Sequence, residues 1–433
     1  MSDEQDGPPR LKLGAVVAVS LGNALAFYDL LIFGIFAVQI GRTIYPPVTP
    51  STQLLLTLGT FGVGFLTRPL GAVVIGRIGD RRGRKPAMLL SFTLAGLCIL
   101  GQAVVPPYAR IGMAAPVLML LLRLVLGFAI GGEVGPSTAY LVEVAPPSRR
   151  GLFVSLQAAT QDMAALVAGL VGFALASSLS DTSLDDWGWR AAMLVGVSIV
   201  PFGLYMRSRL DETLHSSNAE KLAPMTSTTR RVAVLGFIIL VSATVGSYGL
   251  SYLTVYAQTT LGMATDLAFA GTIFYGLAAV LFDLVGGIAS DRFGRKPVML
   301  FGMVSLAATL IPAFLWLNAA PTMMVLGLVS FWLSAVNAIG PAAALVAITE
   351  ALPGSSRAQA VGIVYSLAVA IFGGTTQLII AWLIGVLNAP LAPAYYVLMV
   401  SLVGIGAMLS FPETAPIITR RRGTGSEEYR NLS

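Results

Sequence analysis

The sequence has few charged residues, a single cysteine and a single histidine. Only 11% of its 433 residues are Asp, Glu, Lys or Arg. The lone Cys98 excludes a disulfide framework and a cysteine-based metal site. His215 falls in a polar loop, so no predicted helix carries an imidazole for metal binding or acid–base work. The phosphate-binding pattern G-x-x-x-x-G-K-[ST] is also missing. We therefore predict no enzyme, no metal site, no nucleotide-driven pump and no bound cofactor.

Apolar residues are abundant instead. They make up 56% of the chain, and the mean hydropathy is +0.80. A soluble core of this length could not bury so much apolar surface, so lipid must be the solvent. A spanning helix needs roughly 20 mostly apolar residues. Because the apolar runs are continuous rather than alternating, we predict an all-α integral membrane protein with twelve transmembrane helices, at about 14–40, 54–78, 86–106, 114–144, 152–178, 188–208, 232–258, 267–290, 297–318, 320–350, 358–386 and 392–411.

The basic residues are unevenly distributed between the predicted loops. The chain has 27 Lys and Arg against 21 Asp and Glu, a net charge of +6. Most of the basic residues lie in loops on one side of the predicted helices, and the positive-inside rule assigns that side and both termini to the cytoplasm. The excess charge therefore indicates topology within a cytoplasmic (inner) membrane. We predict no nucleic-acid partner.

Two basic loops repeat. "GRIGDRRGRKPAML" at 76–89 returns as "GIASDRFGRKPVML" at 287–300, and "VEVAPPSRRG" has an echo in "TEALPGSSRAQ". The chain therefore divides into a six-helix bundle at 1–208, a polar cytoplasmic linker at 209–230 and a second six-helix bundle at 231–433 with a short cytoplasmic tail. Internal repeats of this kind are typical of secondary transporters, whose binding site lies between the repeats near the bilayer midplane.

The repeated pattern G-x-x-x-D-R-x-G-R-K resembles the loop signature of the major facilitator superfamily. The segments "GNALAFYDLLIFGIFA", "GFLTRPLGAVVIGRIGDRRGRK", "RLVLGFAIGGEVGPSTAYLVEVAP", "DWGWR" and "AIFGG" are similar to its metabolite:proton symporter branch. Within that branch, "SLQAATQDMAAL" and "TEALPGSSRAQAVGIVYSLAVAIFGGTTQ" look most like the citrate and tricarballylate symporters. The resemblance implies the major facilitator fold, two pseudo-symmetric bundles, and proton-coupled import of a small carboxylate, citrate foremost, by alternating access.

The repeated loops also predict a gate. Asp80 and Asp291 stand at cytoplasmic helix ends beside arginines, where a carboxylate can accept charge-assisted bonds and face the positive N-terminus of a neighbouring helix. Such contacts would hold the cytoplasmic side shut and must break when it opens. The predicted gating residues are Asp80, Arg84, Glu143 and Arg150 in the first half and Asp291, Arg295, Glu350 and Arg357 in the second.

Charged and polar side chains inside the spans form the predicted site. A charge at a helix centre costs about 2.5–3.5 kcal/mol on insertion scales, so these groups should face the bundle interior. Arg123 suits bidentate binding of a carboxylate substrate, and a structural pair with Asp29 or Asp162 is the alternative. The proton-coupling candidates are Asp29, Glu133 and Asp283. The substrate-binding candidates are Asn23, Tyr28, Arg123, Gln157, Gln161, Asp162, Asn337, Tyr365 and Gln377.

The sequence leaves other substrates and other functional classes open. The substrate could be an aromatic or dicarboxylic acid, or a zwitterionic osmolyte such as proline or betaine, for which a site poor in arginine would suffice. The predicted partners are a small anionic metabolite, protons and the lipid bilayer. The proton gradient is the expected energy source with Na⁺ as an alternative, and the expected functional unit is a monomer. A channel and a transporter-shaped sensor are the candidates outside secondary transport.

Overall fold

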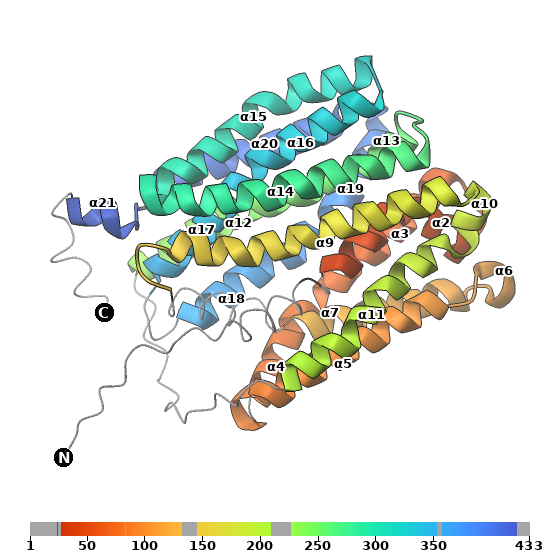
Figure 1. Ribbon diagram of the computed structural model, residues 1–433, viewed down its shortest axis with the longest axis horizontal. Coiled ribbons are helices and arrows are strands. Elements are labelled where there is room, and N and C mark those ends of the chain that lie inside the picture. The colour runs from red at the N-terminus through yellow and green to blue at the C-terminus, as the bar shows by residue number, and fades with distance from the viewer. Residues whose placement is uncertain are drawn as a thin grey trace.

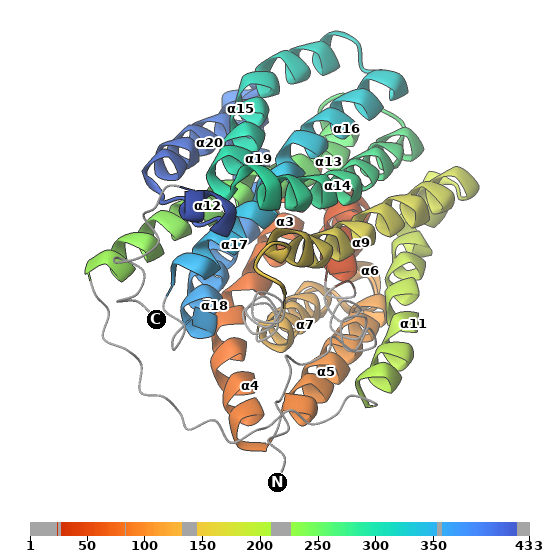
Figure 2. The same ribbon diagram turned by 60° about the vertical axis from the view of Figure 1, so that its left-hand side comes forward.

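The computed structural model describes residues 24, 27–82, 84–131, 145–208, 227–352 and 357–421. Within these ranges the chain is helical, without strands, and forms two bundles that lie side by side (Figures 1 and 2). Three of the predicted site residues, Asn23, Glu133 and Glu143, lie outside the described residues. The side chains of Asp80, Arg84 and Arg357 do so too, as does most of the predicted linker.

The first bundle is built from the segments before residue 209. Its helices are Phe27–Ile35, α2 (Ala37–Ile44), α3 (Pro50–Leu66), α4 (Arg68–Arg82), α5 (Arg84–Val104), α6 (Tyr108–Ile111), α7 (Ala114–Ile130), α9 (Arg150–Ser178), α10 (Asp181–Ser183), the π-turn η1 (Leu184–Gly188) and α11 (Trp189–Ser208).

The second bundle begins at Ser227. Its helices are α12 (Ser227–Ser251), α13 (Leu253–Thr259), α14 (Thr265–Phe293), α15 (Arg295–Ala319), α16 (Met323–Ile339), α17 (Pro341–Ala351), α18 (Arg357–Ala368), the π-turn η3 (Val369–Gly373), α19 (Gly374–Leu387), α20 (Ala392–Ser410) and the short α21 (Pro416–Arg421).

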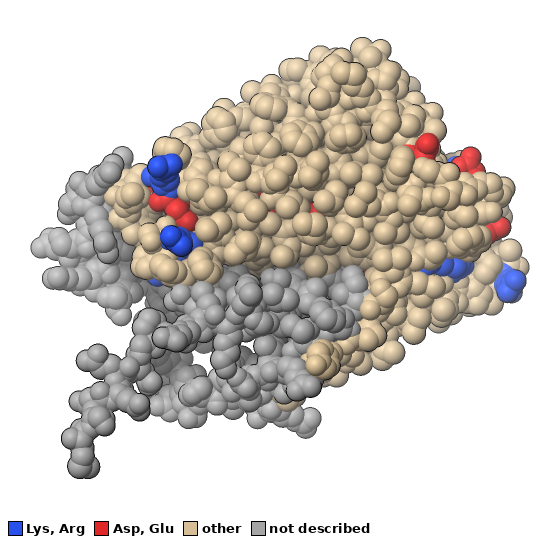
Figure 3. Space-filling model, viewed as in Figure 1, with Lys and Arg blue, Asp and Glu red and all other residues tan. Residues whose placement is uncertain are grey.

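These helices match what a bilayer requires. Among the described residues, eight are long and apolar enough to cross it, and the pair Phe27–Ile35 and Ala37–Ile44, bent by 72°, adds a ninth. Leu89–Val104 and Ala114–Ile130 are shorter apolar helices. Charged side chains gather at the two ends of the visible face, and an uncharged band separates them (Figure 3). The predicted fold class, an all-α membrane protein in two helical halves, is confirmed.

Several spans are broken near their middles. α16 ends at Ile339 and α17 starts at Pro341, because proline has no N–H with which to continue the hydrogen-bond ladder of the preceding turn. The span formed by α18 and α19 is interrupted by η3, whose extra residue in the turn changes the direction in which later side chains point. Broken helices free backbone groups and reorient side chains where a membrane protein encloses a site.

Two helix pairs make the most extensive contacts between the halves. α9 and α14 run side by side along their length in both views, and α3 packs against α19 (Figures 1 and 2). At the second contact, a Cβ on Gly62 would lie 2.5 Å from the carbonyl oxygen of Gly374, so only glycine permits this approach. At the first, a Cβ on Gly276 would lie 2.4 Å from the backbone nitrogen of Leu166. Small residues thus let the two bundles close on each other.

Candidate functional site

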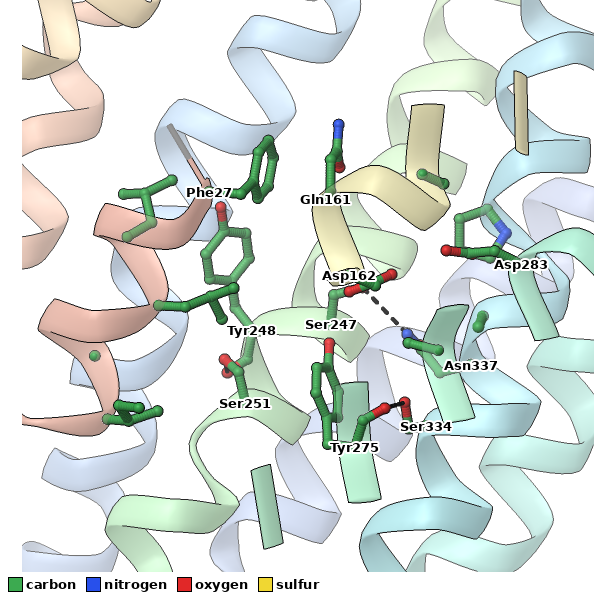
Figure 4. Close-up of a pocket in the computed structure, with 18 of the residues that line it drawn as sticks. Phe27, Gln161, Asp162, Ser247, Tyr248, Ser251, Tyr275, Asp283, Ser334 and Asn337 are labelled. Atoms are coloured by element: carbon green, nitrogen blue, oxygen red, sulfur yellow. Dashed lines mark hydrogen bonds between the residues drawn. The ribbon is translucent and has the colours of Figure 1, made fainter. Parts of the chain in front are cut away.

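A cavity of about 120 Å³ lies between the two bundles. Both halves line it: helix Phe27–Ile35, α3 and α9 from the first, and α12, α14, α16, α17 and α19 from the second. Figure 4 shows α9 and α14 carrying carboxylates into it, with tyrosine and amide side chains around them. Ligand pockets usually measure about 300–1,000 Å³, so this closed cavity suits a small metabolite. Its principal polar residues are Gln161, Asp162, Tyr248, Asp283, Asn337 and Gln377.

The amides of the second bundle are held in place from α12. Asn337 Nδ2 donates to Ser247 Oγ at 3.1 Å, and Gln377 Nε2 donates to Ser251 Oγ at 3.0 Å. Buried polar atoms are normally satisfied. The Tyr248 hydroxyl and Gln377 Oε1 are buried without a hydrogen-bond partner among the described residues. They are therefore free to bond a ligand in the cavity.

Two carboxyl groups meet in the cavity. Asp162 on α9 and Asp283 on α14 line it from two helices that pack along each other, and Figure 4 shows the two side chains next to each other. Among the described residues, no N–H or O–H group donates to Asp283 Oδ2, which is buried. None of the described residues that line the cavity is Arg, Lys or His. The lining is therefore acidic and aromatic.

Arg123 pairs with Asp29 behind the cavity wall. Its Nη1 lies 2.7 Å from Asp29 Oδ2, both side chains are at most 1% exposed, and the guanidinium stacks 3.7 Å from the Phe33 ring centre. The structure thus selects one of the two partners that the sequence left open for Arg123. Arg123 Nε and Nη2 and Asp29 Oδ1 have no hydrogen-bond partner among the described residues. Because a buried ion pair is stable only while both charges persist, proton occupancy at Asp29 would change it strongly.

The predicted substrate-binding residues divide into two groups. Gln161, Asp162, Asn337 and Gln377 line the cavity, whereas Tyr28, Arg123, Gln157 and Tyr365 do not. The Tyr28 hydroxyl donates instead to the backbone oxygen of Ala192 at 2.9 Å and ties the first helix to α11.

Sequence reasoning left out five polar residues of the lining, Ser247, Tyr248, Ser251, Tyr275 and Ser334. Tyr248, Tyr252 and Tyr256 recur at four-residue spacing, a pattern more typical of helix packing than of a ligand site. The serines carry no signal of their own in an apolar helix.

The halves are joined at one end by Asp291, the last acidic residue of α14. Its Oδ1 accepts a bond from Gly151 N at 2.8 Å, and its Oδ2 accepts one from Leu152 N at 2.9 Å. These are free N–H groups of the first turn of α9, where the helix dipole also favours a negative charge. Arg295 Nη1 donates to Asp291 Oδ1 at 2.6 Å. The predicted interaction of Asp291 with a neighbouring helix N-terminus is therefore present, and the helix belongs to the other half.

Glu350 extends this network. It lies 3.3 Å from Arg295 within the second half and 3.4 Å from Arg150 of the first half. Thr414 also donates to it at 2.9 Å. Arg295 and Glu350, both among the predicted gating residues, are thus in contact within the second half. The Arg150–Glu350 contact crosses between the halves, which the sequence did not predict.

The opposite end of the cavity is closed by a different kind of contact. Gln39 Nε2 donates to Gln258 Oε1 of the other half at 3.1 Å, and the rings of Phe36 and Phe269 lie 4.7 Å apart. These neutral contacts join the halves without a charge network. The described residues thus show a cavity closed at both ends.

An ion pair at the same end lies within the first half. Arg42 Nη1 lies 3.1 Å from Asp185 Oδ2, and 52% of the Arg42 side chain is exposed. Partial burial raises the pKa of the Asp185 carboxyl, and the charge of Arg42 opposes this effect. Because the pair is partly open to solvent and does not bridge the halves, it supports local loop structure rather than the gate.

Known proteins show where this architecture occurs. The chain matches the family described as "Sugar (and other) transporter" twice, over residues 15–216 and 205–417, in agreement with its internal repeat. It is 34% identical to the citrate-proton symporter of Salmonella typhi over 91% of this chain and 92% of the relative. It is 30% identical to the proline/betaine transporter of Salmonella typhimurium over 93% and 83% of the two chains. The crystal structure of a D-xylose-proton symporter superposes with a TM-score of 0.74 at 20% identity, covering 93% of this chain and 98% of that one.

Proposed function

The chain belongs to the sugar (and other) transporter family of the major facilitator superfamily, and from this membership we propose that it is a proton-coupled symporter that imports a small metabolite by alternating access. The observation that carries the proposal is the cavity between the halves, closed at both ends by contacts that cross from one half to the other. Breaking one set while keeping the other would expose the cavity to one side at a time.

The basic loops support an orientation with the Asp291 end and both termini in the cytoplasm of a bacterial cell. The charge network of Asp291, Arg295, Glu350 and Arg150 is then the cytoplasmic gate. The glutamine and phenylalanine contacts close the outer side. The protein acts as a monomer, without catalysis or cofactor, and the proton gradient across the inner membrane supplies the energy.

The buried pair of Asp29 and Arg123 supports proton coupling. A proton that binds Asp29 cancels its charge, while Arg123 keeps its own because a guanidinium stays protonated. The released arginine then attracts an anion toward the cavity. Protonation and substrate binding would favour each other through this single side chain, which is what symport needs.

A small carboxylate, citrate foremost, is the first substrate candidate. Two observations support it: the 34% identity to a citrate-proton symporter over most of both chains, and a buried arginine that is paired with a single carboxylate. An arginine binds a carboxylate through two parallel hydrogen bonds, so such a substrate would replace Asp29 as its partner.

A zwitterionic osmolyte is the second candidate, favoured by the lining of the cavity. Asp162 and Asp283 are its only charged described residues, and the rings of Phe27, Tyr248 and Tyr275 line the same cavity (Figure 4). Carboxylates together with aromatic faces suit a quaternary ammonium group. The similarity to a proline/betaine transporter agrees with this choice.

Counterflow in proteoliposomes tests the proposal and separates the candidates. Purified protein is reconstituted with unlabelled citrate or glycine betaine inside, and uptake of the same labelled compound is followed. We expect exchange of one of the two and none in empty liposomes. Binding without exchange would contradict transport and identify a sensor. Exchange of neither, with a third metabolite exchanged in a wider screen, would contradict both substrates.

Variants of the buried pair test its role. We expect Arg123→Ala to abolish carboxylate uptake and Asp29→Asn to preserve counterflow while abolishing accumulation driven by an acid outside pH. Because an unpaired buried charge can prevent folding, the double variant Arg123→Ala with Asp29→Asn, which leaves no charge behind, provides a folded comparison. Arg42→Ala, at an exposed arginine, is the matched control. Carboxylate uptake retained in Arg123→Ala would contradict the anion-binding role.

A further inference from the structure

The carboxyl pair of Asp162 and Asp283 spans the boundary between the two halves. Asp162 belongs to α9 of the first bundle, and Asp283 belongs to α14 of the second. These are the two helices that run along each other between the bundles (Figure 1). Asp283 is 2% exposed. Whatever changes the charge of this pair therefore acts directly on the contact that must open and close.

Two carboxylates cannot share a hydrogen bond without a proton. When both are ionised, each oxygen is only an acceptor, and the two charges repel at short range. When one carries a proton, an O–H···O⁻ bond joins them. Since no other donor among the described residues reaches Asp283 Oδ2, a proton is the group that completes the pair.

No other charge of the described lining can stabilise the pair. The groups that face it from neighbouring elements are neutral: Gln161 on α9, Tyr275 on α14, Ser247 and Tyr248 on α12, Ser334 and Asn337 on α16 and Gln377 on α19. Both tyrosines ionise only in strongly basic solution. Along α9 the described charged neighbour is Arg150, about 18 Å away at 1.5 Å per residue. Along α14 the charged neighbours are Asp291, Arg292 and Asp266, about 12, 14 and 26 Å away at the same rise. Glu350 of α17 lies at the Asp291 end, and Asp29 is occupied by Arg123.

We propose that Asp162 and Asp283 form a second proton site, in which one shared proton holds α9 and α14 together in the closed state and its loss drives the two halves apart. This inference rests on the proposed function and adds to it a site distinct from the Asp29–Arg123 pair.

The proton balance is simple. In the closed state one proton lies between the two carboxyl groups, and the pair carries a charge of minus one. On opening toward the cytoplasm, where the pH is higher, the proton passes to water and leaves two hydrated carboxylates. Reprotonation restores the O–H···O⁻ bond and allows closure. An anionic substrate would thus meet the pair at its lowest negative charge.

The spacing between the halves tests this in the protein without ligand. Leu90 on α5 and Phe301 on α15 occupy equivalent places in the two repeats, at the gated end, and are 46% and 62% exposed. Spin labels at Leu90→Cys and Phe301→Cys, in a Cys98→Ala background, report their separation by pulsed electron paramagnetic resonance. We expect a short distance at low pH and a long one at high pH, with the ratio of the two populations changing by about 5- to 150-fold between about pH 5 and about pH 8.

Substitutions at the pair make the test specific. In Asp162→Asn the amide donates to Asp283 without any added proton, so the short distance should persist at every pH. The double variant Asp162→Asn with Asp283→Asn should also keep the short distance at every pH, and it replaces the single variant in the test if that variant folds poorly. Asp266→Asn, on α14 but outside the cavity, should titrate like the parent.

The outcomes separate the two proposals. A pH response that survives unchanged in both pair variants would overturn the shared-proton site. So would a midpoint that shifts with NaCl but not with KCl, because the pair would then hold sodium. A distance that responds to citrate or glycine betaine but not to pH would overturn the inference and leave transport intact. A distance fixed under every condition would contradict alternating access itself.

Discussion

Replacing Asp291 with asparagine should open the cytoplasmic gate. The carboxylate accepts one hydrogen bond from Gly151 N and one from Leu152 N, at 2.8 and 2.9 Å, and a third from Arg295 at 2.6 Å. Asparagine has the same shape but one acceptor oxygen, and its NH₂ group would face an N–H of α9. The substitution therefore removes charge and one acceptor from the contact between halves while leaving the volume unchanged.

The magnitude follows from these bonds. Hydrogen bonds to charged groups contribute about 1.5–3 kcal/mol each, against about 1 kcal/mol for neutral ones. The side chain is only 10% exposed, so solvent screens it little. In Asp291→Asn the closed state loses one charge-assisted hydrogen bond, and a second one becomes weaker. Because water hydrates the freed groups in the open state, the closed state is destabilised relative to the open state by about 2–3 kcal/mol. That amounts to a shift of about 30- to 150-fold toward the open state, at tenfold per 1.4 kcal/mol.

Thiol labelling measures this shift. Ala158 lines the cavity on α9, and Ala158→Cys in a Cys98→Ala background places one reactive thiol there. In inside-out vesicles, a membrane-impermeant maleimide should modify it about 30- to 150-fold faster in Asp291→Asn than in the parent. Asp266→Asn is the control and should leave the rate unchanged. An unchanged rate in a folded Asp291→Asn protein, or an equal increase in the control, would refute the role given to the contact.

Two further predictions concern packing and surface charge. Gly127→Ala should clearly lower the melting temperature of the detergent-solubilised protein, because its Cβ would lie 1.6 Å from the backbone oxygen of Gly64. Gly76→Ala is the control and should leave the melting temperature unchanged, because open space surrounds Gly76. Equal melting curves for the two variants would contradict the close approach of α3 and α7. Arg42→Gln should leave both the melting temperature and uptake nearly unchanged, since exposed ion pairs such as Arg42–Asp185 contribute about 0–1 kcal/mol to the free energy of unfolding. A large loss of uptake would instead place this pair in the outer gate.

The fold could be predicted because lipid imposes it on the sequence. Every spanning segment must be helical and about 20 residues long, so apolar runs and basic loops alone indicate the helices and the two halves. The breaks within the spanning helices were harder to predict. The interruption before Pro341 follows from proline, but the π-turn Val369–Gly373 lies in an ordinary apolar run, where no residue type announces it.

The site was predictable in its residue types and less so in its pairings. A charge in a span must find a partner, which correctly directed attention to Arg123, yet the choice between Asp29 and Asp162 depends on how helices pack. The closeness of Asp162 and Asp283 depends on packing between the two halves, 121 positions apart in the chain. Local pattern carries no information about such a contact. The place of Tyr248 in the cavity lining could not be predicted for the same reason. Its neighbours in sequence are not its neighbours in the cavity.

If the protein is a carrier, its solute crosses the membrane through the cavity between the halves. Counterflow across proteoliposomes, measured with the parent protein and with Gly276→Leu, decides this, because a leucine there would collide with the backbone of Leu166 and wedge α9 from α14. We expect the parent protein to exchange labelled for unlabelled citrate or glycine betaine, and the wedged variant, folded and still in the membrane, not to do so. Exchange at the same rate in both would contradict passage between the two halves.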